Sequence, residues 1–254
     1  MDFAHVTTWI FDLDNTLYAP EVRLFAQIER RMTAYVMREL RVTEAEASRL
    51  RDHYWRQHGT TLAGLMAEHG IAPGPYLEHV HDIDFSALSP DPELAALIAA
   101  LPGRKIIHTN ADRRYAAKVL AHRQLSVFDQ IYGVEETGFH PKPDPRAYAA
   151  VRQADGFDPA AAAMFEDDPR NLAVPHRLGM RTVLVGPGRH GPDELAADHD
   201  HGPHVQHRTN ALTDFLRMLA ETRNPAKIRQ QPAATPEDDH GTREPGRTEG
   251  RKAP

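Results

Sequence analysis

The stretch TTWIFDLDNTLY, residues 7–18, changes abruptly from apolar to acidic at Asp12. Its first five residues are β-branched or aromatic, a composition that favours a buried strand. The acidic residue marks the point where such a strand leaves the apolar core. We therefore predict a strand over Thr7–Phe11, with Asp12, Asp14 and Thr16 just beyond its carboxyl end.

Outward from this strand, short apolar runs alternate with helical patterns. Further strands are expected at Lys105–His108, Gln130–Val134, Ala163–Phe165 and Thr182–Val185, with a weaker one near Val205–Thr209. Helices are expected at about 93–101 and 112–123, from Asp144-Pro145 onward, after the fourth strand up to Leu178, and at 212–219. Strands separated by helices are joined by right-handed crossovers, which make their pairing parallel. The pattern predicts an α/β fold with a Rossmann-like, doubly wound parallel sheet.

The segment after the first strand has a purely helical character. Three helical patterns follow one another, at about 21–40, from the capping pair Thr43 and Glu46, and from Thr60 or Thr61 to Gly70. No strand signal interrupts the segment before about residue 88. We therefore expect a helical cap at 20–88, inserted after the first strand of a core formed by 1–19 and 89–222.

The end of the chain, residues 223–254, is rich in proline, glycine and charge and has few apolar residues. Such a segment cannot bury enough surface to offset its chain entropy. We predict a disordered C-terminal tail.

The composition excludes several classes of function. The chain has 254 residues, a formal net charge of −6 and no cysteine. Disulfides, thiolate metal sites and a cysteine nucleophile are therefore excluded, and the charge gives no reason to expect binding to nucleic acid or to an anionic membrane. The N-terminus lacks the pattern of a secretory signal and no run is long and apolar enough to span a membrane, so we expect a cytoplasmic protein.

Polar side chains follow four of the predicted elements. They are Asp12, Asp14 and Thr16; Thr109 and Asn110; Lys142; and Glu166, Asp167 and Asp168. The carboxyl ends of parallel strands meet at one edge of the sheet, where ligands bind. Carboxylates suit Mg²⁺ and can act as nucleophile or acid/base, while a lysine and a hydroxyl stabilise phosphoryl oxygens. The set predicts phosphoryl transfer with Mg²⁺.

Taken alone, each of these segments most often has a structural role, as a turn, a helix cap or an exposed loop lysine. The four together, in this order along the chain, are a more specific sign of an active site. FDLDNTLY (11–18), Thr109-Asn110, PKPD (141–144) and Glu166-Asp167-Asp168 resemble the four motifs of the haloacid dehalogenase-like hydrolases. The resemblance covers roughly residues 7–220 and implies the same α/β core.

The resemblance also implies a role for each matching residue. Asp12 would be the nucleophile and a metal ligand, and Asp14 the general acid/base, with its backbone carbonyl on the metal. Thr109 and the Asn110 backbone would bind the phosphoryl group, and Lys142 would pair with Asp12 and the phosphate. Asp167 would hold Mg²⁺, supported by Asp168 or Asn171.

Two details of the motifs point to one subfamily within these hydrolases. Asn15 in the first motif and FEDDPRNL (165–172) with its Asn171 are similar to the pyrimidine 5′-nucleotidase subfamily. This implies a Mg²⁺-dependent hydrolase of small phosphomonoesters that forms an aspartyl phosphate and acts on a nucleoside monophosphate, as a monomer or homodimer. The alternatives are a phosphatase for phosphoglycolate or a sugar phosphate and, from another class, a phosphoacceptor signalling domain or a non-catalytic binding domain.

Other candidates are weaker. The histidines between His190 and His207 are irregularly spaced, which favours a solvated loop over a metal site. In the cap, His53, Tyr54, Trp55 and His58 are equally consistent with substrate contacts and with ordinary helix positions, whereas Met32 and Tyr35 are expected in the core.

Overall fold

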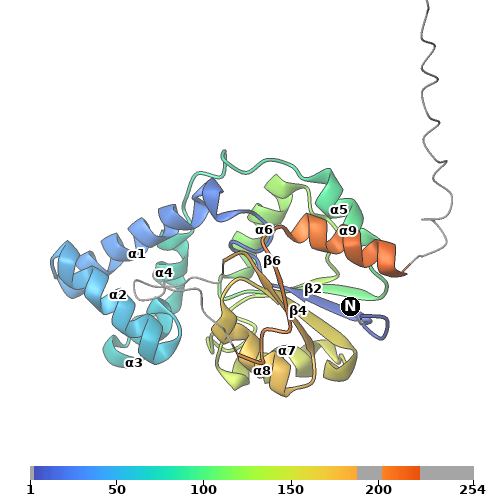
Figure 1. Ribbon diagram of the computed structural model, residues 1–254. Helices are drawn as coiled ribbons and strands as arrows, with labels where there is room; N and C mark the ends of the chain where they lie inside the picture. The colour runs from blue at the N-terminus through green and yellow to red at the C-terminus, as the bar shows by residue number, and fades with distance from the viewer. Residues whose placement is uncertain (1–2, 188–201, 224–254) are drawn as a thin grey trace, which may run out of the picture.

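The computed structural model describes residues 3–187 and 202–223 and contains a six-stranded sheet with a helical cap to one side (Figure 1). Every strand pairs in parallel, in the order β3-β2-β1-β4-β5-β6. The strands are β1 (Thr8–Phe11), β2 (Arg104–His108), β3 (Gln130–Tyr132), β4 (Ala162–Glu166), β5 (Arg181–Val185) and β6 (His207–Thr209). The predicted doubly wound parallel sheet is confirmed.

β1 lies at the centre of the sheet, where the strand order reverses. Its four residues are all buried, as expected for a strand covered on both faces. Phe11 is level with Ile107 of β2 and with Phe165 of β4. The residues that follow these three strands are therefore delivered to one place at the edge of the sheet, the usual ligand site of such folds.

Helices cover both faces of the sheet (Figure 1). Side chains of α5 (Pro92–Ala99), α6 (Arg113–Arg123) and α9 (Leu212–Arg223) share a core with Trp9 and Phe11. Side chains of α7 (Pro145–Asp155) and α8 (Ala173–Arg177) share a second core with Ile10. Alternate residues of β1 thus enter opposite layers, as the pleat of a strand requires.

The cap consists of α1 (Leu24–Leu40), α2 (Glu44–His58), α3 (Thr61–His69) and α4 (Pro73–Val80), preceded by the 3₁₀ helix η1 (Pro20–Val22). Thr43 and Thr60 accept hydrogen bonds from the amides of Glu46 and Ala63, so each caps a helix. The predicted helical insert after the first strand is confirmed, and α4 is an additional helix that the pattern did not separate. The boundaries of the cap at residues 20 and 88 stay a prediction.

Several elements differ in extent from the prediction. β3 ends at Tyr132, and the next residue, Gly133, packs so closely on the loop between β2 and α6 that an added Cβ would lie 2.7 Å from the Ala111 carbonyl oxygen. The helix expected after β4 is split into the 3₁₀ helix η3 (Pro169–Leu172) and the short α8. Pro175 has no amide to donate to the carbonyl of residue 171, four positions earlier, so the two pieces lack that helical hydrogen bond. A further 3₁₀ helix, η2 (Pro159–Ala161), precedes β4.

The C-terminal helix also differs, since α9 runs to Arg223 and not to residue 219. The predicted tail beyond it, residues 224–254, lies outside the described residues, as do His190, His199 and His201. None of the helices in the described part of the chain is long and apolar enough to cross a membrane.

Candidate active site

A cavity of about 260 Å³ lies between the carboxyl ends of the strands and the cap. Every residue to which the sequence assigned a site role contributes to its lining: Asp12, Asp14, Thr109, Asn110, Lys142, Asp167, Asp168 and Asn171. The cap contributes most of the opposite wall. The residues after four separate elements are thus brought together, as expected from the parallel direction of the strands.

Lys142 lies at the centre of this group and is 1% exposed. Its ammonium donates to Asp12 Oδ1 at 2.6 Å, to Glu166 Oε2 at 2.6 Å and to the His108 carbonyl oxygen at 2.8 Å. The three donors of the ammonium are therefore all used, and the group has a fixed position. The pairing of Lys142 with Asp12 agrees with the sequence; the pairing with Glu166 was not anticipated.

Asn110 fixes the backbone of Lys142. Its side-chain nitrogen donates to the Lys142 carbonyl oxygen at 3.1 Å, and its side-chain oxygen accepts from the Lys142 amide at 2.7 Å. The Asn110 side chain is therefore occupied on both its oxygen and its nitrogen. The buried Thr109 accepts from the Ala111 amide at 3.1 Å, so its own hydroxyl proton is available to a ligand in the cavity.

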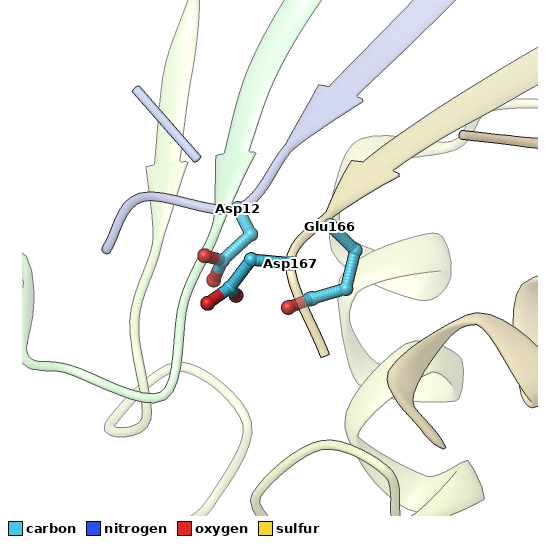
Figure 2. A group of neighbouring side chains, drawn as sticks. All are labelled: Asp12, Glu166 and Asp167. Carbon is cyan, nitrogen blue, oxygen red and sulfur yellow. The ribbon is translucent and has the colours of Figure 1, made fainter. Parts of the chain in front are cut away.

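The carboxylates of Asp12, Glu166 and Asp167 converge from the ends of β1 and β4 (Figure 2). One oxygen atom of each lies within 4.8 Å of the others, which is compatible with a common cation. Hard oxygen donors of this kind suit Mg²⁺. Nearby, Asn171 is 6% exposed, and within the described part of the chain its side-chain oxygen has no hydrogen-bond partner, so a further oxygen beside the cavity is open to a cation.

Burial and mutual proximity raise the pKa values of two of these acids. Burial, reinforced by the charge of Glu166, raises the pKa of Asp12 to about 8, although Lys142 opposes the shift. Burial and the charges of Glu166 and Asp12 also raise the pKa of Asp167 well above its usual range. Burial disfavours the charged form of Lys142 as well, but Asp12 and Glu166 hold its pKa above the ordinary value. One ammonium thus faces three carboxylates, an excess of negative charge that a cation would neutralise.

Asp14 has partners that the sequence did not reveal. Its Oδ1 accepts hydrogen bonds from the hydroxyls of Tyr18 at 2.6 Å and Tyr115 at 2.7 Å. Burial raises the pKa of Asp14, and both hydrogen bonds act in the opposite direction. Tyr18 belongs to the motif that was quoted from the sequence, whereas Tyr115 lies on α6 and carried no local signal.

Asp168 has a structural role in this arrangement. It caps η3 through the Arg170 amide at 3.0 Å, and its carboxylate pairs with the Arg170 guanidinium at 2.6 Å. The same guanidinium lies 3.4 Å from the centre of the Trp55 ring, on helix α2 of the cap. Arg170 therefore links the acidic edge of the core to the cap through a cation–π contact.

On the cap side of the cavity, the lining residues differ in part from those expected from the sequence. Trp55 lines the cavity, while His53 and His58 pair with Glu68 and do not line it. Met32 was expected in the core but also lines the cavity. A helical stripe cannot distinguish a core contact from a cavity wall, because both are apolar.

Comparisons with known proteins agree with this site. A model of the haloacid dehalogenase-like hydrolase family matches residues 6–179. Phosphate metabolism protein 8 of Saccharomyces cerevisiae is 26% identical over 197 residues, which are 69% of this chain and 60% of that protein. The chain thus spans about three fifths of the length of this curated relative.

Solved structures share the fold at lower identity. A haloacid dehalogenase-like family protein from Streptococcus pneumoniae superposes with a TM-score of 0.57 at 16% identity, covering 85% of this chain and 99% of the other. L-2-haloacid dehalogenase from Xanthobacter autotrophicus gives 0.54 at 17% identity, with 85% and 98% covered. A phosphatase from Thermococcus onnurineus gives 0.53 at 16% identity, with 84% and 98% covered. The family match extends across all four polar segments of the site, and this chain belongs to the haloacid dehalogenase-like hydrolases.

Proposed function

We propose that this protein is a Mg²⁺-dependent phosphohydrolase of small phosphomonoesters, with Asp12 as nucleophile. The observation that carries the proposal is the position of Asp12, held by Lys142 at 2.6 Å and grouped with the Asp167 carboxylate at the cavity. A carboxylate held in this way can attack phosphorus, which splits one difficult hydrolysis into two easier steps. Asp14, which a phosphatase needs as acid and base, lines the same cavity.

In the first step, a carboxylate oxygen of Asp12 forms a bond to phosphorus as the bond to the leaving oxygen breaks. Asp14 gives its proton to that oxygen. In the second step, Asp14 takes a proton from water as the water oxygen attacks phosphorus and the bond to Asp12 breaks. Thr109 and the Asn110 backbone bind the phosphoryl oxygens throughout, and the charge of Lys142, held beside Asp12, stabilises them electrostatically.

The residues present fit a magnesium ion. Asp12, the backbone carbonyl of Asp14 and Asp167 would hold it, and the unpartnered side-chain oxygen of Asn171 makes this residue a better supporting ligand than Asp168, which is paired with Arg170. When bound, the ion would neutralise the charge of the phosphate and reduce the repulsion among the carboxylates of Asp12, Glu166 and Asp167.

We further propose a pyrimidine nucleoside monophosphate as substrate. The resemblance of Asn15 and Asn171 to the pyrimidine 5′-nucleotidases supports it, and so do the apolar walls that the cap presents, among them Phe25, Ile28 and Met32. Glu29 and Asp52 also line the cap side, where Arg51 already donates to Glu29. A neutral ring fits this environment better than the second anionic group of phosphoglycolate or the many hydroxyls of a sugar phosphate.

Phosphate release from a panel of esters tests the proposal. The panel contains UMP, CMP, AMP, phosphoglycolate and a sugar phosphate, each with Mg²⁺ and with EDTA. We expect metal-dependent release that favours UMP and CMP, and no release by the folded Asp12→Asn variant. Another preference would reject the pyrimidine substrate alone. No release from any ester would reject the phosphatase and favour a phosphoacceptor or binding domain.

The cytoplasmic location and the monomeric or dimeric state stay predictions from the sequence. Size-exclusion chromatography with light scattering would determine the oligomeric state.

A further inference from the structure

The carboxylate of Asp14 is held at one oxygen only. The hydroxyls of Tyr18 and Tyr115 both donate to Oδ1, at 2.6 and 2.7 Å. An ionised carboxylate oxygen has two lone pairs in its plane, and two donors use both. Among the described residues, no side chain or backbone group donates to Oδ2. Asp14 is partly exposed and lines the cavity, so the two oxygens of one carboxylate have different environments.

Both tyrosines are themselves fixed. Tyr18 is 3% exposed and Tyr115 is 1% exposed. Tyr115 belongs to the first turn of α6, where its amide donates to the capping Asp112 Oδ1 at 2.7 Å. Their hydroxyls can therefore move little, and a carboxylate bound to both has a restricted orientation.

The cap contributes to this arrangement. His81, at the C-terminal end of α4, lies flat on the Tyr115 ring, with 4.2 Å between ring centres and 18° between planes. Its Nδ1 also forms a 2.6 Å hydrogen bond with Asp112 Oδ2. Asp112 thus fixes both partners of the stacked pair, one from the core and one from the cap.

We infer that Tyr18 and Tyr115 are positioning residues that hold Asp14 so that Oδ2 is the atom that exchanges the proton in both half-reactions. This inference rests on the proposed phosphatase function. Oδ2 carries the proton to the leaving oxygen as the phosphorus–oxygen bond breaks. It then accepts a proton from the water whose oxygen attacks phosphorus, as the bond to Asp12 breaks, which restores the starting state.

The leaving group provides the test, because the two kinds of ester differ in their need for the proton. The alkoxide that leaves UMP must be protonated, whereas the nitrophenolate that leaves p-nitrophenyl phosphate is stable without a proton. We expect Tyr18→Phe and Tyr115→Phe each to lower the ratio of kcat/KM for UMP to kcat/KM for p-nitrophenyl phosphate about tenfold, a part of the ~10²–10⁴ that acid–base catalysis supplies. This ratio reports the first half-reaction alone, whereas the release of phosphate from Asp12 is the same step for both esters. The double variant should lower the ratio further. If UMP is not hydrolysed, the fastest alkyl monoester of the panel replaces it.

Tyr54→Phe is the matched control. Tyr54 is a buried tyrosine of the cap that makes an equally short hydrogen bond, 2.6 Å to His69, but it does not line the cavity. Its ratio should equal that of the wild type even if its thermal stability falls. A purely structural role of Tyr18 and Tyr115 would lower both values of kcat/KM equally, and that outcome, or no loss at all, overturns the inference. Failure of the wild type to hydrolyse any ester would reject the proposed function instead, and the inference with it.

Discussion

The ammonium of Lys142 lies 2.6 Å from the carboxylate of Asp12, although 130 positions separate the two residues in the chain. Lys142 is 1% exposed and makes an equally short pair with Glu166. A buried ion pair is stable only while its charges balance, since water cannot solvate a charge that loses its partner. Lys142 therefore stabilises the fold in addition to its proposed catalytic role, and the two effects can be measured separately.

Lys142→Met should remove both activity and stability. The variant leaves Asp12 and Glu166 as facing buried carboxylates without a cation, so we expect a loss of about 3–5 kcal/mol in the free energy of unfolding. Phosphatase activity should fall at least ~10²-fold, because a group that stabilises phosphoryl charge is lost. Urea unfolding and steady-state kinetics measure the two effects.

A double variant separates these effects. Adding Glu166→Gln to Lys142→Met removes one of the opposed carboxylates, so stability should recover by about half while activity stays low. Equal stabilities of the single and double variants would show that repulsion between Asp12 and Glu166 is not the cause.

The stability of the metal-free protein should depend on pH through Asp12. Its pKa is raised to about 8 by burial and by Glu166, so the folded state binds the proton more tightly than the unfolded state does. The resulting stabilisation is fully present below the ordinary pKa of an aspartate, near 4, and is lost as the pH rises towards 8. The Tm in EDTA should therefore fall between pH 5 and about pH 8.

Magnesium should reverse this trend, since the ion binds the ionised carboxylates and competes with protons. We expect the increase in Tm on adding Mg²⁺ to be larger at about pH 8 than at about pH 5. The Asp12→Asn variant should show a weaker dependence of Tm on both pH and Mg²⁺. A Tm in EDTA that rises over this range would contradict the assignment.

The contact between Arg170 and Trp55 should influence substrate binding. Trp55→Leu removes the aromatic face that the Arg170 guanidinium covers at 3.4 Å, a contact worth about 0.5–2 kcal/mol. Because this contact joins the cap to the core beside the cavity, we expect KM for the preferred ester to rise about three- to tenfold, with kcat within about twofold. Trp55→Phe, which retains a smaller aromatic face, should give an intermediate KM. An unchanged KM for Trp55→Leu would show that the contact does not influence binding.

Much of the fold follows from local patterns. The change from apolar to acidic at Asp12 predicted the end of β1, since an ionisable side chain is disfavoured inside a strand that is buried on both faces. The absence of strand signals between Pro20 and residue 88 predicted the helical cap for a similarly local reason. The extents of β3 and of the helix after β4 were predicted less well. Gly133, just beyond β3, packs closely on a loop distant in sequence, and the segment after β4 contains prolines at 169 and 175.

The site, like the fold, has features that the sequence predicts and features that it does not. The sequence by itself determined which residues reach the carboxyl edge of the sheet, because strand direction fixes where Asp12, Thr109 and Asp167 emerge. Only the tertiary structure decided their partners. Three contacts of the site join residues 32 to 101 positions apart in the chain: Asn110 holds the backbone of Lys142, Tyr115 donates to Asp14, and His81 lies on Tyr115. Periodicity encodes the face on which a side chain lies, whereas its contacts are set by the crossovers and by the packing of the cap against the core.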